Sequence, residues 1–304
     1  MNDPQAYFNG RTIPVSEVAV PIYDLGFVQG TTVAEQLRTF AGKLFRLDDH
    51  LARLAQSLAI VGVDPGVTLA ELRGIAEDLA GRNHALLQPR DDLNLIVFVT
   101  PGGSSALAPA GYGPAVCVHT IPLPFRFWAH KYLEGESLAT TDFQQVPGEC
   151  WPPQLKCRSR MHYYLADREA RAKHAGARAL MLDQEGLVTE ATTANLAIYV
   201  EGQGFSTPPH AKVLPGISLR VLAQLAGELG IPLAERDLTT ADVAAADEVL
   251  LTSTSPCIVP VTRLNGRPIG KGVPGPVHRQ LLAAWSSHVG VDIAKQAGDF
   301  ASRG

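Results

Sequence analysis

Apolar residues recur along this chain at the two spacings that distinguish helices from strands. Leu51, Leu54 and Leu58 repeat every three or four residues behind Asp48 and Asp49, which predicts a helix capped by one of these aspartates. Near-continuous apolar runs predict buried strands instead. Further helices are expected over 68–82, 158–174 and 217–229. Strands are expected over 93–100, 115–121, 178–183, 194–200 and 248–253.

Turn-forming residues organise these segments. Asn9-Gly10 predicts a first hairpin, and residues 39–45 predict a second one around Gly42. The stretch 121–135 is interrupted by prolines and ends in a glycine, which is typical of a connection between domains. The expected parts are an N-terminal α+β domain over 1–122, a linker over 123–134 and a C-terminal domain over 135–304. Regular βαβ alternation is not evident in either half.

Composition narrows the class of protein. A chain of 304 residues is long enough for two cores, and its net charge of -4 without a Lys/Arg block argues against a nucleic-acid partner. We find no apolar run of roughly 18 residues and no signal-peptide layout, so we expect a cytoplasmic protein that does not span a membrane. The four cysteines form no C-x-x-C pair and the nine histidines show no ligand spacing, so no metal site is predicted.

Lys156 is the first residue with an indication of chemistry. It follows Trp151-Pro152-Pro153, precedes a predicted helix, and has Arg158 and Arg160 close behind it. Cationic neighbours and burial both favour a neutral amine, which is the form that Schiff-base chemistry requires. The alternative is a surface lysine at the start of a helix, which is the common situation for lysine.

Glu190 lies among small and hydroxyl residues at the entry to a predicted strand. Small neighbours permit a flat ring to approach, and a carboxylate beneath a pyridine ring would hold its nitrogen protonated. The alternative is an ordinary glutamate at a strand edge.

Two further segments and one arginine could bind an anion. Gly216, Ile217 and Ser218 open a predicted helix whose first N–H groups point outward. The run 252–255 places four hydroxyl residues after an apolar strand. Arg53 falls off the leucine stripe of its helix, and arginine is suited to gripping phosphate. A capped helix, a Ser/Thr-rich loop and a solvated arginine are the alternatives.

The order of these segments resembles the class IV aminotransferases, which include branched-chain aminotransferases, D-amino-acid aminotransferases and aminodeoxychorismate lyases. The resemblance runs from about Tyr7 to Ala284. Ordered matches carry it, and each alone is weak. They are the segments 7–10, 26–30, 45–54, Lys156 ahead of 166–170, 188–190 with Asn195, 214–218, and 252–254 before 259–261.

The resemblance implies the D-amino-acid-aminotransferase-like fold called fold type IV, with a smaller N-terminal and a larger C-terminal α+β domain. It also implies pyridoxal 5′-phosphate (PLP) as cofactor, amino acids and 2-oxo acids as substrates, and a homodimer. Lys156 matches the Schiff-base lysine and general base, and Glu190 matches the partner of the ring nitrogen. The phosphate cup matches Arg53, Gly216, Ile217, Ser218 and Thr254. The substrate side matches Gln29, Arg38, Asn94 and Ser255.

The substrate positions depart from the branched-chain pattern. Asp92 and Asn94 stand where branched-chain enzymes usually carry tyrosine and arginine, and Gln29 replaces an aromatic residue. Met161 occupies a usual tyrosine position, with Tyr163 and Tyr164 nearby. We expect transamination of a branched-chain-type L-amino acid. The open alternatives are an aminodeoxychorismate lyase, a D-amino-acid aminotransferase and a catalytically silent PLP-fold binding protein.

Overall fold

A computed structural model describes residues 3–104 and 106–302. The chain divides into two compact units. The first is Met1–Leu123 with Leu155–Ser159, and the second is Pro124–Gln154 with Arg160–Gly304. No helix within the described ranges is both long and apolar enough to cross a membrane.

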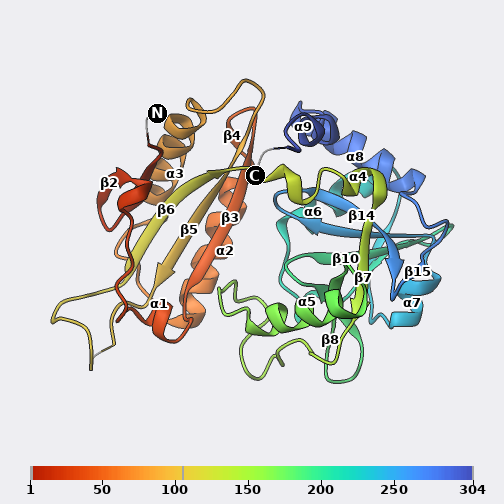
Figure 1. The fold of residues 1–304 in the computed structure, drawn as a ribbon, viewed down its shortest axis with the longest axis horizontal. Coiled ribbons are helices and arrows are strands. Elements are labelled where there is room, and N and C mark those ends of the chain that lie inside the picture. The colour runs from red at the N-terminus through yellow and green to blue at the C-terminus, as the bar shows by residue number, and fades with distance from the viewer. Residues whose placement is uncertain (1–2, 105, 303–304) are drawn as a thin grey trace. The chain divides into compact units, whose positions relative to one another are not determined.

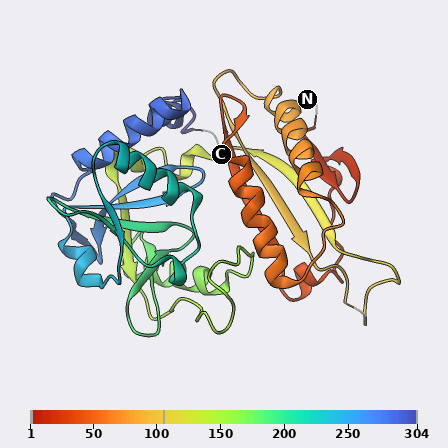
Figure 2. The same ribbon diagram turned by 180° about the vertical axis from the view of Figure 1, so that it is seen from behind.

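The first unit is a six-stranded sheet with two long helices on one face (Figures 1 and 2). Its strand order is β2-β1-β6-β5-β3-β4. The neighbours β3 and β5, and β5 and β6, pair antiparallel over most of their lengths. The elements are β1 (Gln5–Phe8), β2 (Arg11–Pro14), η1 (Val15–Glu17), α1 (Leu25–Val28), β3 (Val33–Phe40), β4 (Lys43–Leu44), α2 (Leu47–Val61), α3 (Leu69–His84), β5 (Leu93–Thr100) and β6 (Ala115–Pro122).

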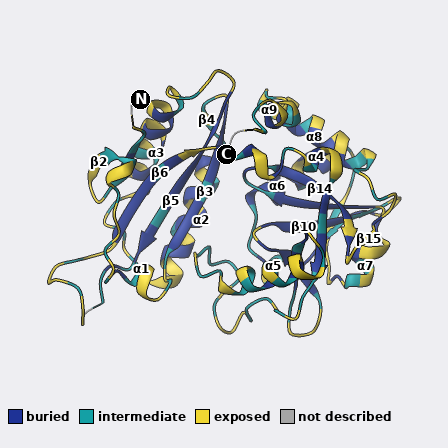
Figure 3. Ribbon diagram, in the orientation of Figure 1, coloured by how far each residue is buried: buried dark blue, intermediate teal, exposed yellow. Residues whose placement is uncertain are grey.

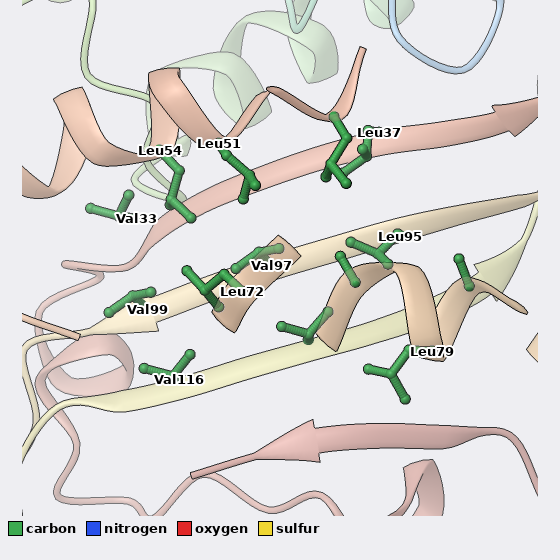
Figure 4. Close-up of a cluster of buried hydrophobic side chains, with 14 of the residues drawn as sticks. Val33, Leu37, Leu51, Leu54, Leu72, Leu79, Leu95, Val97, Val99 and Val116 are labelled. Atoms are coloured by element: carbon green, nitrogen blue, oxygen red, sulfur yellow. The ribbon is translucent and has the colours of Figure 1, made fainter. Parts of the chain in front are cut away.

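The core of this unit lies between the two helices and the sheet. Figure 4 shows Leu51 and Leu54 of α2 and Leu72 and Leu79 of α3 directed at the strands. Each is at most 5% exposed, and burying one such leucine contributes about 1.5–3 kcal/mol. The predicted leucine stripe therefore forms as expected. However, the cap of α2 is Arg46 in a left-handed conformation, and Asp48 and Asp49 lie in the first turn.

Strand β3 alternates between the two faces of the sheet. Val33 and Leu37 belong to the core beneath the helices, so Glu35 between them faces the same way. Arg38 has the opposite parity and faces away from this core. This alternation places one acidic residue under α2 and one basic residue on the other face.

The second unit is built on a nine-stranded sheet, mostly buried (Figure 3). The order is β12-β11-β10-β13-β14-β7-β8-β9, and β15 pairs with β14. The strands are β7 (Glu136–Thr140), β8 (Arg178–Leu182), β9 (Val188–Ala191), β10 (Asn195–Val200), β11 (Gly204–Thr207), β12 (Leu233–Glu235), β13 (Glu248–Ser253), β14 (Cys257–Leu264) and β15 (Arg267–Pro268). The helices are η2 (Phe125–Phe127), α4 (Lys131–Glu134), α5 (Met161–Lys173), η3 (His210–Lys212), α6 (Ile217–Glu228), α7 (Thr240–Ala245), α8 (Pro276–Val289) and α9 (Ile293–Asp299).

Two segments differ from what the sequence suggested. The helix expected over 158–174 begins at Met161, because residues before it are extended and pair with the first unit: Val33 bridges Cys157, and the Arg158 N–H donates to the Thr32 carbonyl (2.8 Å). The proposed linker over 123–134 contains η2 and α4, and nearly all of it belongs to the second unit. The domain limits 1–122 and 135–304 remain a prediction. Lys156 lies within the second of these ranges, but its contacts group it with the first unit.

Candidate active site

Arg53 is paired inside the first unit rather than solvated. Its Nε donates to Glu35 Oε1 at 2.7 Å, and its Nη2 donates to Glu35 Oε2 at 2.9 Å. Arg53 is 7% exposed and Glu35 1%. Two parallel hydrogen bonds between a guanidinium and a carboxylate fix the plane of both groups. Glu35 on β3 therefore fixes the orientation of Arg53, the arginine that we predicted to bind phosphate. The sequence analysis did not identify Glu35.

His50 completes a buried cluster with these two residues. Its Nδ1 lies 2.8 Å from Glu35 Oε2. Burial would raise the pKa of Glu35, but the Arg53 charge and the hydrogen bonds from His50 and Arg53 together lower it to about 2. Burial lowers the pKa of His50 despite its bond to Glu35. The cluster therefore contains an ionised Glu35, a charged Arg53 and a neutral His50 at neutral pH.

Lys156 lies beside this cluster. The Ala34 N–H donates to the Lys156 carbonyl at 3.0 Å, and the Lys156 N–H donates to Ser57 Oγ at 3.1 Å. Its positive charge is one of the influences that lower the pKa of His50. The backbone of Lys156 is thus tied to β3, which carries Glu35, and to α2, which carries Arg53. The structure brings the predicted lysine and the predicted phosphate arginine together in one unit.

Glu190 lies in the second unit, on β9, and is 4% exposed. Its Oε1 accepts from the Tyr163 hydroxyl at 2.5 Å and from Gln145 Nε2 at 3.0 Å. Its Oε2 lies 3.4 Å from Asn195 Nδ2. A buried carboxylate surrounded by donors is held in one orientation in its charged form. Although β9 is at the edge of the sheet, Glu190 is buried and is not an ordinary exposed glutamate.

Asn195 connects Glu190 to the loop before α6. Its Nδ2 donates to the Leu214 carbonyl at 2.8 Å. A Cβ on Gly216 would lie only 1.9 Å from Asn195 Oδ1, so only glycine lets the loop approach this closely. The first helical bond of α6 runs from the Arg220 N–H to the Gly216 carbonyl. The N–H groups of Ile217 and Ser218 precede that bond and point out of the helix start, as an anion site requires.

The hydroxyl run 252–255 reaches the same region through sheet pairing. Thr252 on β13 is directly opposite Asn195 on β10. Thr254 and Ser255 follow in the three-residue turn between β13 and β14, which ends at Cys257 with a φ of 63°. The Thr252 hydroxyl is buried and has no hydrogen-bond partner among the described residues. Asn195 therefore lies at the junction of three predicted segments: Glu190, residues 214–218 and residues 252–255.

The predicted substrate residues have different surroundings. Arg38 on β3 is directly opposite Asn94 on β5, and both are 1% exposed. The Arg38 guanidinium lies 4.0 Å from the centre of the Phe40 ring. Gln29 is exposed at the end of α1, whereas Ser255 is buried in the second unit. Only Arg38 and Asn94 are neighbours in the sheet.

Asp92 has a structural role. Its side chain accepts from Thr39 Oγ1 at 2.6 Å and from the N–H groups of Ala41 and Gly42 at 3.1 and 3.0 Å. It therefore fixes the tight turn between β3 and β4. A tyrosine at this position, as in branched-chain enzymes, would remove these three bonds.

Gly216→Ala is expected to lower the free energy of unfolding by about 1–3 kcal/mol, because the added methyl group must displace the Asn195 side chain. Thermal and urea denaturation measure the change. Gly227→Ala is the matched control on the same helix, since a Cβ there meets nothing within 4 Å. Alanine should stabilise that position by roughly 0.5–1 kcal/mol. Equal effects of the two substitutions would contradict the close approach of Asn195.

Comparison with known proteins identifies the family to which this chain is similar. The family model for amino-transferase class IV matches residues 32–264. The chain is 32% identical to D-alanine aminotransferase of Bacillus licheniformis, over 95% of this chain and 98% of that protein. It is 29% identical to a putative branched-chain-amino-acid aminotransferase of Methanocaldococcus jannaschii, over 90% of this chain and 93% of that one.

Solved structures show the same architecture. The branched-chain amino acid aminotransferase of Escherichia coli superposes with a TM-score of 0.84 at 26% identity, covering 94% of both chains. The branched-chain amino acid aminotransferase of Thermobaculum terrenum, solved in its PLP form, gives 0.82 at 24% identity, covering 97% of both chains. The α+β fold predicted from the sequence is thereby confirmed.

Proposed function

The chain belongs to the class IV aminotransferase family, as its motifs predicted, and we propose that it transfers amino groups with PLP bound covalently to Lys156. The observation that carries this proposal is the anchoring of Lys156 beside the Glu35–Arg53 pair, on the same two elements. Another branched-chain amino acid aminotransferase, 26% identical to this chain, was solved with pyridoxamine 5′-phosphate, which supports the same kind of cofactor here.

The residues present fit such a cofactor. Glu190 offers a buried carboxylate for the ring nitrogen, and Gly216 lets the loop before α6 lie against Asn195, whose Nδ2 is 3.4 Å from Glu190 Oε2. Arg53, the N–H groups of Ile217 and Ser218, and the Thr254 hydroxyl are the donors that we assign to the phosphate group. When bound, PLP supplies an electron sink that makes the Cα–H bond of an amino acid acidic.

Lys156 has two tasks in this proposal. Its amine would hold the cofactor between turnovers and, when free, would take the proton from the donor Cα. The same amine would later give that proton back, so one group would act as base and then as acid. Glu190 stays ionised and keeps the ring nitrogen protonated throughout, while Arg53 and the α6 start prevent the phosphate from moving.

Branched-chain L-amino acids are the donors that we expected from the sequence, and several relatives with this fold are branched-chain enzymes. D-alanine is a second candidate, favoured by two observations. A D-alanine aminotransferase matches at 32% identity over almost the whole chain. In addition, Asp92 holds a turn and Asn94 is neutral at the two positions where branched-chain enzymes usually have tyrosine and arginine.

A donor screen separates these candidates. Purified protein with PLP is assayed with L-valine, L-leucine, L-isoleucine, L-alanine and D-alanine, using 2-oxoglutarate or pyruvate as acceptor. Turnover of the branched-chain donors at least about tenfold above D-alanine, a difference of about 1.4 kcal/mol in transition-state stabilisation, would support the first candidate. The reverse order would support the second. Pyruvate release from aminodeoxychorismate without an acceptor would identify a lyase instead, and absence of any turnover would favour the silent binding protein.

We also propose a homodimer, as the family resemblance implied. Light scattering coupled to size exclusion at several protein concentrations measures the mass. A mass equal to one chain of 32.5 kDa at all concentrations would contradict this assignment.

A further inference from the structure

The carboxylate of Glu190 has an unusually complete set of donors on one oxygen. Tyr163 on α5 donates its hydroxyl to Oε1 at 2.5 Å, and Gln145 donates its amide to the same oxygen at 3.0 Å. Gln145 Nε2 also lies 3.3 Å from the Tyr163 oxygen, which closes a three-membered network. Neither Tyr163 nor Gln145 was among the residues that the family resemblance assigned to the site.

Tyr163 is a permanent donor in this network. Burial, followed by the negative charge of Glu190, raises its pKa well above the usual value of a tyrosine. The hydroxyl therefore keeps its proton at neutral pH, and its oxygen does not compete with Glu190 for negative charge. A hydrogen bond to a charged acceptor is about twice as strong as a neutral one.

Hydrogen bonds to both the N–H and the carbonyl of Gln145 fix its backbone. Its N–H donates to the Leu182 carbonyl at 2.8 Å, and its carbonyl accepts from Gln184 Nε2 at 2.7 Å. Its side-chain Oε1 is buried with no partner in the described part of the chain. The opposite amide orientation would place that oxygen against the Glu190 carboxylate, which is repulsive. The unpaired oxygen thus results from directing the amide N–H groups at Glu190.

We propose that Tyr163 and Gln145 are positioning residues that fix Glu190 through Oε1 and keep its negative charge in place, so that Oε2 holds the proton of the PLP ring nitrogen. This inference rests on the proposed function. Hydrogen bonds to a carboxylate lower its affinity for a proton. With both donors present, the shared proton stays on the ring nitrogen. Without them, it passes towards Glu190 and the ring becomes a weaker electron sink.

Adjacent tyrosines on α5 provide a matched pair of variants. Tyr163→Phe removes only the hydroxyl that donates to Glu190. Tyr164→Phe makes the same chemical change one residue away, on a side chain that is 62% exposed. Gln145→Met removes the second donor while keeping a side chain of similar length. Far-UV circular dichroism and thermal denaturation establish that each variant is folded.

The first readout is the protonation of the ring nitrogen, followed by ¹⁵N NMR of holoenzyme reconstituted with ¹⁵N-labelled PLP. In Tyr163→Phe, and further in the double variant with Gln145→Met, the resonance should move towards that of unprotonated pyridine. In Tyr164→Phe it should match wild type. An unchanged resonance in folded Tyr163→Phe overturns the inference. Absence of lysine-bound PLP in wild type is a different result, which overturns the proposed function itself.

The second readout uses a PLP analogue in which carbon replaces the ring nitrogen. With PLP, Tyr163→Phe should lower kcat/KM by roughly ten- to a hundredfold, as expected for loss of a hydrogen bond to a charged group. With the analogue bound to both proteins, the rate of Tyr163→Phe should differ from the rate of wild type by less than about twofold, because Glu190 no longer has a ring proton to hold. An equal loss with both cofactors would mean that Tyr163 only supports the fold, and would overturn the inference.

Discussion

Lys156→Ala is expected to reduce transamination by roughly 10⁴-fold or more, since general acid–base catalysis alone contributes about 10²–10⁴-fold and the covalent attachment of the cofactor is lost as well. The backbone bonds that tie this segment to Ala34 and Ser57 are left in place by the substitution. The variant should therefore fold and still bind PLP non-covalently. Steady-state kinetics with the best donor and the visible absorbance of lysine-bound PLP measure the two effects.

Lys271→Ala is the control for this substitution, because Lys271 is exposed in the second unit. It should retain wild-type rates and the wild-type spectrum. Borohydride reduction followed by peptide mapping gives an independent assay: the reduced cofactor should be attached to the peptide that contains residue 156. A label on another lysine, or more than about 10% of wild-type activity in Lys156→Ala, would contradict the assignment of Lys156.

Local patterns predicted the individual elements well. The leucine spacing in α2 and the apolar runs of β5, β6, β8, β10 and β13 were sufficient, because hydrophobic periodicity is imposed by burial on one or both faces. The hairpin between β3 and β4 also formed where Gly42 suggested a turn. Short or mixed elements such as β7, β9 and β14 were missed or only implied, since four to eight residues with mixed polarity carry little periodic signal.

The contacts within the candidate site were harder to predict from the sequence than the helices and strands. Glu35 could have been noticed, because it occupies a core-facing position between Val33 and Leu37 in an otherwise apolar strand, and a charge there requires a partner. Tyr163 and Gln145 gave no such signal, because they meet Glu190 only through the packing of separate segments. The sequence did not indicate that the Lys156 segment contacts the first unit, because chain order does not reveal that a short segment returns to pair with β3.

The Glu35–Arg53 pair explains how Arg53, the arginine that we assign to the phosphate group, can be only 7% exposed. A guanidinium on α2 without a carboxylate opposite it would be a buried, unpaired charge, which is strongly unfavourable. With Glu35 bonded to Nε and Nη2, the charge is balanced and the orientation of the guanidinium is set by a rigid strand. We therefore expect Arg53 to contribute both to stability and to binding of the phosphate group, and substitution can separate the two contributions.

Glu35→Leu is expected to lower the free energy of unfolding by about 3–5 kcal/mol, the usual effect of removing one partner of a buried ion pair. The double variant Glu35→Leu/Arg53→Leu should recover most of this loss, because no uncompensated charge is left in the core. Urea denaturation of the apoprotein measures both. The double variant should nevertheless bind PLP more weakly than wild type, since it lacks the phosphate donor on α2.

The pH dependence provides a second test of the same pair. The pKa of Glu35 falls from an ordinary 4.5 to about 2 on folding, so its contribution to stability is fully present above the unfolded-state value. It is lost progressively as the pH falls from about 4.5 towards 2, where Glu35 becomes protonated in the folded protein too. The stability difference between wild type and Glu35→Gln should therefore shrink across this window. A difference that stayed the same down to the acid limit would mean that Glu35 supports the fold by its shape and not by its charge.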